Sequence, residues 1–256
     1  MGLFVREDPY YDPDVRQVGF NRYKQLLSQH AFSWIKLNLL TVLGALPLAA
    51  GIGYAILSSS VLLLIPLSIL GGMIWGPFLA GLYDGILRGL RDAPGRWWTF
   101  WRKSWRQNGR ESLLPGAILG LLIGMYAFMA ALFWWSPGPQ TPGTLALYLF
   151  SGALFLLLNT LYWPQLVLFR QTTLNRMRNI ILFTAKYFWR MVGVTLLQLI
   201  YILIYVFLAP WTLLLVPLLG LWYIIFLSQF LIYEPMDQEL GIEEKFQTSN
   251  AKSRSN

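Results

Sequence analysis

The stretch RGLRDAPGRWWTFWRKSWRQNGR, residues Arg88–Arg110, separates two long uncharged parts of the chain. It holds seven basic and five aromatic residues. On a helix running from Asp92 to Arg110, the aromatic side chains fall on one face and the basic side chains on the opposite face. An amphipathic helix of this kind lies in the headgroup layer of a membrane. We expect Asp92 to cap its start and Pro94 to lie in its first turn.

The basic and aromatic faces of this segment form the first candidate site. Their side chains can bind anionic lipid headgroups at the cytoplasmic surface. They can equally dock an acidic partner, such as a cytoplasmic subunit of a transport complex, and the two interpretations do not exclude each other. The candidate residues are Arg96, Arg102, Lys103, Arg106 and Arg110, together with Trp97, Trp98, Trp101 and Trp105.

The composition indicates a membrane protein. Of the 256 residues, 56% are hydrophobic and only 12% are charged, whereas soluble domains carry about 25% charged residues. The net charge of +8 could suggest nucleic acid as a partner. However, the basic residues flank apolar segments, which is the positive-inside pattern of a membrane protein, so no nucleic acid is expected. Because the chain has no cysteine, disulfide bonds and thiolate metal sites are excluded.

Three uncharged stretches predict the membrane spans. The first, Leu37–Tyr83, would reach about 70 Å as one helix, more than twice the thickness of the hydrocarbon core, so it must reverse direction. Glycine, proline and serine residues predict the three reversals, near residues 51–60, 136–144 and 209–211. The predicted spans are residues 37–57, 61–83, 113–135, 145–169, 191–209 and 211–233.

Every charge lies on one side of this arrangement. The 20 basic residues divide as 5 in segment 1–36, 7 in the Arg88–Arg110 stretch, 5 in segment 170–190 and 3 in the tail 234–256. Because loops rich in Lys and Arg stay in the cytoplasm, both termini are predicted to be cytoplasmic. The predicted fold class is therefore all-α, a polytopic bundle of six transmembrane helices with interfacial amphipathic helices. One of these is expected over Gln17–Lys36, before the first span.

Several motifs resemble those of the YesL-like family of bacterial integral membrane proteins. They are Asn38-Leu39-Leu40, the stretch Gly76–Tyr83, then Arg88, Pro94, Phe100-Trp101 and Leu113–Gly116. The resemblance covers about residues 30–235, and in the family the first two motifs lie closer together than here. Residues 37–83 are thus either two full spans or one that includes a re-entrant segment. The resemblance implies a multi-pass protein of the bacterial plasma membrane, linked to carbohydrate uptake, and it implies no catalytic residue.

The sequence contains no recognisable catalytic or cofactor-binding motif. The predicted spans hold no Asp, Glu, Lys, Arg or His, which proton relays and ion-coupled carriers require. Asp84, at the end of the second span, is expected to pair with Arg88 one helical turn away. The single histidine, His30, is interpreted as a solvated or interfacial residue. We therefore predict that the protein is not an enzyme and carries no metal or cofactor.

Uncharged polar residues inside the spans have two interpretations. They can join helices by hydrogen bonds, or they can line a pocket for a neutral solute such as a sugar, with aromatic rings stacking on it. The candidate pocket residues are Asn159, Gln165, Gln198 and Gln229, and the candidate stacking residues are Tyr162, Trp163, Tyr201, Tyr205, Trp222 and Tyr223. The glycine series Gly81/Gly85/Gly89 and Gly116/Gly120/Gly124 are expected at helix contacts.

Two functions remain open at this point. The first is a non-enzymatic accessory or scaffolding component of a membrane system, whose link to carbohydrate uptake comes only from the resemblance. The second is a small transporter or channel for an uncharged polar solute. They differ in one structural requirement, because a transporter needs a polar cavity that reaches the middle of the membrane and is lined by residues such as Asn159 and Gln198.

Overall fold

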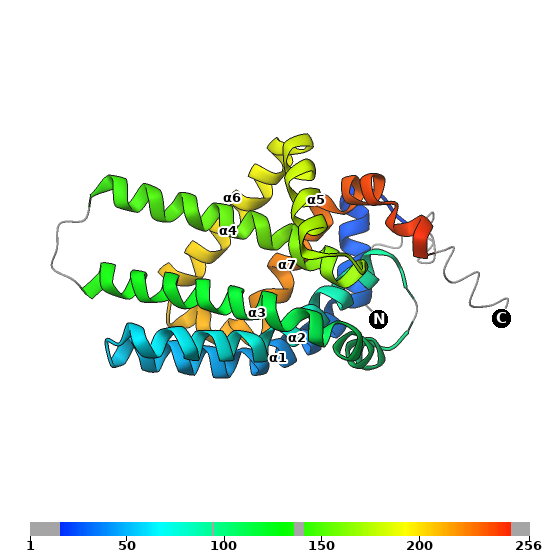
Figure 1. Cartoon of the computed structure of the whole chain (residues 1–256). Coiled ribbons are helices and arrows are strands. Elements are labelled where there is room, and N and C mark those ends of the chain that lie inside the picture. Colours follow the sequence, from blue (N-terminus) through cyan, green and yellow to red (C-terminus); the bar gives the residue numbers. More distant parts are fainter. Residues whose placement is uncertain (1–15, 94, 136–140, 247–256) are drawn as a thin grey trace.

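The fold is an all-α bundle containing six helices that are long and apolar enough to cross a membrane (Figure 1). The computed structural model describes residues 16–93, 95–135 and 141–246. The predicted turn at 136–144 and the segments 1–36 and 234–256 therefore lie partly outside the described residues. The elements are α1 (Gly19–Leu57), α2 (Val61–Leu90), α3 (Trp97–Trp135), α4 (Pro142–Leu168), α5 (Thr173–Lys186), α6 (Phe188–Phe207), the 3₁₀ helix η1 (Trp211–Leu215) and α7 (Val216–Leu240).

The first uncharged stretch forms two helices of spanning length and no short re-entrant segment. Helix α1 ends at Leu57, and α2 begins at Val61 after a turn in which the hydroxyl of Ser60 accepts a hydrogen bond from the N–H of Leu63. The helix predicted over Gln17–Lys36 and the first span are one uninterrupted helix of 39 residues. Such a helix is about 58 Å long, so its first turns extend beyond a hydrocarbon core of about 30 Å.

Helices α2 and α3 make the closest contact in the bundle. A Cβ atom added to Gly72 of α2 would lie 2.3 Å from the carbonyl oxygen of Gly116 in α3, and one added to Gly76 would lie 3.1 Å from the Gly116 Cα. On α3, Gly120 packs against Gly72 in the same way. Small residues allow two backbones to approach this closely in a membrane, where dispersion forces drive helix association. The predicted packing role of this glycine series is confirmed.

The glycine series at the end of α2 receives large side chains from other helices. A Cβ atom on Gly81 would lie 2.6 Å from the indole ring of Trp101, and one on Gly85 would lie 2.2 Å from the side chain of Leu37. A Cβ atom on Gly89 would lie 2.7 Å from the ring of Trp34. These three positions therefore fix α1 and the start of α3 against α2, as expected of a packing face.

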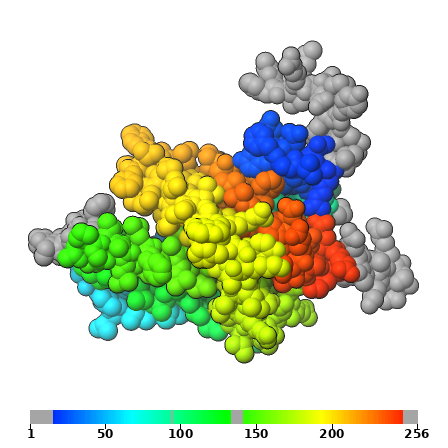
Figure 2. Space-filling view, turned by 90° about the horizontal axis from the view of Figure 1, so that it is seen from above, coloured from blue at the N-terminus to red at the C-terminus, as the bar shows by residue number. Residues whose placement is uncertain are grey.

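The remaining helices cover one side of this three-helix layer. Figure 1 shows α4 and α6 on the side away from α1 and α2, with α7 between them and α1, and Figure 2 shows α4 and α6 in front when that side faces the viewer. Many apolar side chains of α4 and α6 are exposed, including Phe150, Ile200 and Phe207. Exposed apolar surface of this extent on long helices is suited to contact with lipid.

Ion pairs join segments that are distant in the sequence at one end of the bundle. Arg16, just before α1, pairs with Glu243, just after α7, at 2.7 Å, so the start of α1 and the end of α7 lie together. Arg176 of α5 pairs with Glu111 of α3 at 2.8 Å. Asp84 pairs with Arg88 at 2.8 Å along α2, which confirms that prediction. The α1–α2 turn, which has no charge, lies at the opposite end (Figure 1).

The basic-aromatic helix begins later than predicted. Asp92 does not cap it; this residue has a left-handed φ of 53°, and its carboxylate accepts a hydrogen bond from Arg22 at 2.7 Å. Gly95 also has a positive φ, 136°, which is incompatible with a right-handed helix, and α3 starts at Trp97. From there α3 continues without a break into the third span. The predicted cap failed because Asp92 closes the end of α2 and bonds to α1.

Candidate functional site

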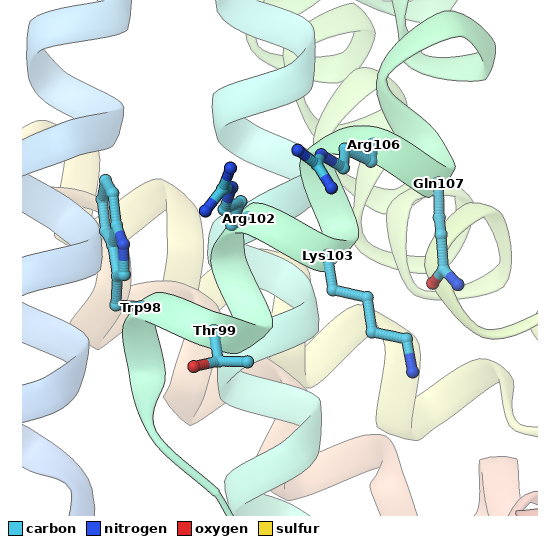
Figure 3. A pocket seen from close by; sticks show the side chains of 6 residues that line it. All are labelled: Trp98, Thr99, Arg102, Lys103, Arg106 and Gln107. Carbon is cyan, nitrogen blue, oxygen red and sulfur yellow. The ribbon is translucent and has the colours of Figure 1, made fainter.

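The first turns of α3 present a basic surface at the charged end of the bundle. Figure 3 shows this part of the helix running in front of α2, with Arg102 and Arg106 on one side and Lys103 pointing away from them. A shallow hollow of about 440 Å³ lies along it. The residues lining the hollow are Trp98, Thr99, Arg102, Lys103, Arg106 and Gln107.

The cations of this surface have no ionic partner within the described residues. Arg102, Lys103, Arg106 and Arg110 are exposed on α3, and Arg96 is exposed just before it. Nearby carboxylates are engaged elsewhere, since Glu111 pairs with Arg176, Asp84 with Arg88 and Asp92 with Arg22 and Arg16. We call the five residues Arg96, Arg102, Lys103, Arg106 and Arg110 the basic surface.

The tryptophans of this segment divide between two roles. The ring of Trp101 fits over Gly81 and lies 5.8 Å from the ring of Phe78, so it holds the helix against α2. Trp97 is half-buried, 5.5 Å from the ammonium group of Lys36 on α1. Trp98 and Trp105 remain 49% and 42% exposed. The sequence placed all four on one face, but it did not reveal that Gly81 provides the contact for one of them.

A second candidate site is a cavity of about 380 Å³ inside the spanning part of the bundle. Five helices line it. The lining residues are Trp75, Leu79 and Tyr83 of α2, Leu119 and Ile123 of α3, Phe155, Leu156, Asn159, Thr160 and Trp163 of α4, Gln198, Tyr201, Ile202, Tyr205 and Val206 of α6, and Val216, Gly220, Leu221, Ile224 and Ile225 of α7.

The cavity contains only part of the predicted polar pocket. Asn159 and Gln198 line it, whereas Gln165 and Gln229 do not. Gln165 donates to the carbonyl oxygen of Leu161 at 3.2 Å within α4. Gln229 donates to the carbonyl oxygen of Thr160 at 2.9 Å and so joins α7 to α4. Of the predicted stacking residues, the cavity is lined by Trp163, Tyr201 and Tyr205, and not by Tyr162, Trp222 or Tyr223.

The polar atoms around the cavity are bonded to one another. The side-chain N–H₂ of Gln198 donates to the hydroxyl oxygens of Thr160 and Ser228, both at 2.8 Å, which joins α6 to α4 and α7. Asn159 donates to the carbonyl oxygen of Phe155 at 2.8 Å and accepts from the indole of Trp163 at 3.0 Å. The interpretation of these residues as hydrogen-bonding links is confirmed for Gln198, while the cavity wall itself is largely apolar.

The hydroxyl group of Tyr201, which also lines the cavity, is hydrogen-bonded as well. Tyr201 donates to the carbonyl oxygens of Leu219 and Gly220 at 2.9 and 3.0 Å, near the start of α7. The tyrosine spacing gave no indication of this bond, because it depends on where α7 begins. Tyr201 therefore supports the cavity wall through its hydroxyl group.

The described residues include no group of three His, Asp or Glu side chains close enough together to hold a metal ion. The resemblance to the YesL-like family stays a prediction that rests on the motif residues given above. Comparison of the chain with family models, with curated proteins and with solved structures finds no match.

Proposed function

We propose that this multi-pass protein is a non-enzymatic accessory or scaffolding component of a bacterial plasma-membrane system. The observation that supports the proposal is the basic surface, whose five cations are exposed and unpaired within the described residues. Elsewhere at the same end of the bundle, arginines such as Arg22 and Arg176 are engaged by carboxylates. A surface whose charge is not neutralised by the part of the chain that the structure describes is suited to an external partner.

The basic surface is suited first to anionic lipid headgroups. Each Lys or Arg near an anionic membrane surface contributes about 1 kcal/mol of attraction. Trp98 and Trp105 add exposed aromatic rings of the kind enriched at membrane interfaces. Because Trp101 holds the segment against Gly81, the cations are presented on a helix fixed to the bundle. An acidic subunit of a transport complex would bind the same surface, and the family resemblance suggests carbohydrate uptake as its setting.

The cavity favours a second candidate, a transporter for an uncharged polar solute. It is lined by Asn159 and Gln198 and by the rings of Trp163, Tyr201 and Tyr205. However, the amide groups of Asn159 and Gln198 already have protein partners. A sugar would leave many hydroxyl groups unsatisfied against an apolar wall, which costs free energy for each unpaired group. The accessory role is therefore the better supported of the two.

Site-specific crosslinking in cells tests the accessory role. A photoreactive residue replaces Gln107, which lines the hollow beside the cations, and in a matched variant it replaces Arg178, which is exposed on α5. We expect Gln107 to give an adduct with a defined membrane-associated protein or with anionic lipid, and Arg178 to give none or a different one. Replacing Arg102, Lys103 and Arg106 by Gln should reduce the Gln107 adduct at least tenfold.

The charge-matched control replaces Arg170, Arg178 and Arg190, three exposed arginines of the other basic segment, by Gln. It removes the same net charge and should leave the Gln107 adduct unchanged. Equal loss in both triple variants would mean that only net charge matters and would contradict a localised docking surface. Solute flux into vesicles that contain only the purified protein would overturn the accessory role in favour of the transporter.

A further inference from the structure

The cavity is closed on one side and partly exposed on the other. At its inner end, Thr160, Trp163 and Gln198 are buried. At its outer side, Ile202 and Val206 of α6 are 43% and 53% exposed. Both outer residues lie on a helix of spanning length, whose surface faces hydrocarbon in a membrane. The wall of the cavity therefore reaches the lipid-facing surface at these two residues of α6.

The wall of the cavity has few groups to offer a polar ligand. Leu79, Leu119 and Ile225 are among the apolar side chains that contribute most of it. The hydroxyl of Tyr201 is bonded to two backbone carbonyl oxygens of α7. The amide of Gln198 is bonded to Thr160 and Ser228. A ligand that enters this space meets apolar surface, so it gains from dispersion contacts more than from new hydrogen bonds.

We infer that the cavity binds one acyl chain of a membrane phospholipid. The volume of about 380 Å³ falls within the range of about 300–1,000 Å³ that is typical of small-molecule sites. The surrounding solvent supplies such chains at high concentration, and an acyl chain needs no hydrogen-bond partner. An aqueous solute would have to cross the exposed apolar side chains of α6 to reach the same space. This inference is independent of the proposed function, because the cavity and the hollow along the basic surface share no lining residue.

The position of the opening indicates the leaflet from which the chain enters. Tyr205 and Val206 lie at the end of α6, close to the uncharged turn that leads into η1. Tyr83 and Trp163, at the inner end, lie toward the charged end of the bundle, since Tyr83 precedes the Asp84–Arg88 pair. The bound lipid thus belongs to the leaflet at the uncharged end, with its headgroup near Tyr205.

Native mass spectrometry of the full-length protein tests this inference. The protein is taken from vesicles of phosphatidylglycerol and phosphatidylethanolamine and washed with detergent. We expect one phospholipid to remain bound to the unsubstituted protein. Leu156→Trp on α4 and Ile202→Trp on α6 place an indole ring in the cavity and should reduce the lipid-bound fraction at least tenfold. The matched controls are Leu154→Trp and Ile200→Trp, which lie outside the cavity on exposed surfaces of the same two helices and should retain the lipid.

Equal retention in the filling and control variants would overturn the inference, because the lipid would then lie on the outer surface. A bound mass that corresponds to a polyisoprenoid lipid would overturn the acyl assignment. A second experiment crosslinks the unsubstituted protein to a phospholipid that carries a photoreactive group at the end of its acyl chain. Its result does not depend on how a variant folds. We expect adducts at inner residues such as Thr160 and Trp163; adducts confined to exposed positions such as Leu154 and Ile200 would contradict the proposal.

Discussion

The side-chain oxygen of Asn38 in α1 accepts a hydrogen bond from the backbone N–H of Trp222 in α7 at 3.1 Å. It also accepts from the N–H of Leu221 at 3.0 Å, and its N–H₂ group donates to the carbonyl oxygens of Val216 and Pro217 at 2.9 and 2.8 Å. One fully buried amide thus bonds four backbone groups in the first turns of α7. Because Leu221 and Trp222 are the sixth and seventh residues of α7, these bonds join the first two turns of that helix to α1.

Asn38→Ala is expected to destabilise the protein by about 1–3 kcal/mol, the usual cost of leaving buried polar groups without a partner. Four backbone groups lose their side-chain partner at once, and the bonds lie at buried or partly buried positions. The free energy of unfolding in lipid nanodiscs, or the midpoint of thermal unfolding in detergent, measures the effect.

Asn108→Ala is the control for this variant. Asn108 lies in the first turns of α3 and donates only to the hydroxyl of Ser104, one helical turn earlier. Its loss should change the free energy of unfolding by less than about 0.5 kcal/mol, as for most partly exposed substitutions. If the two alanine variants are equally stable, the four bonds of Asn38 do not contribute to the fold.

The contact between α2 and α3 predicts a strong effect at Gly72. In Gly72→Ala the new methyl group would meet the carbonyl oxygen of Gly116 at 2.3 Å and the Cα of Gly120 at 2.8 Å. Both atoms belong to the backbone, so the helices must separate. We expect a loss of about 1–3 kcal/mol, the usual cost of an overpacked core.

Gly53→Ala is the matched substitution on α1, since outside the adjoining helix backbone no atom of the described residues lies within 4 Å of its added methyl group. Here the higher helix propensity of alanine should leave stability unchanged or raise it by up to about 1 kcal/mol. A stable Gly72→Ala protein would show that α2 and α3 are not in close contact in the membrane.

The link between Gln198 and Thr160 gives a prediction about the cavity. The two side chains exchange hydrogen bonds between α6 and α4 at 2.8 and 3.2 Å. A double-mutant cycle with Gln198→Leu and Thr160→Val should give a coupling energy of about 0.6 kcal/mol, the average for such bonds in membrane proteins. A coupling near zero would mean that the amide of Gln198 faces the cavity and is available to a polar solute.

Hydropathy and charge were sufficient to predict the helical fold class. Each uncharged stretch is long enough for two crossings, and the all-α bundle with six long apolar helices confirms that prediction. Glycine spacing also predicted a contact face correctly, because small residues at every fourth position lie on one face of a helix and allow another helix to approach closely. These features are local or periodic, and such features can be read from the sequence.

Features that depend on tertiary partners could not be predicted. Asp92 has the residue type of a helix cap, but Arg22, 70 positions earlier, engages its carboxylate. Gln165 and Gln198 look alike in sequence, yet only Gln198 reaches the cavity, because the helix packing determines which amide faces inward. Asn38 stood among several polar residues within the spans, and its four backbone partners lie about 180 residues away.

The orientation of the bundle gives the last prediction. All charges lie on one side of the predicted threading, and one charge at the centre of the bilayer costs about 2.5–3.5 kcal/mol on insertion scales. The charged end is therefore expected in the cytoplasm.

Because the chain contains no cysteine, single introduced cysteines can report this orientation without interference from a native thiol. Ser58→Cys and Thr141→Cys should react with a membrane-impermeant maleimide in intact cells. Gln107→Cys and Arg178→Cys, at exposed positions of the charged end, should react only after permeabilisation. Labelling of Gln107→Cys in intact cells would show that the bundle has the opposite orientation. The basic surface would then face away from the anionic cytoplasmic leaflet that it is proposed to bind.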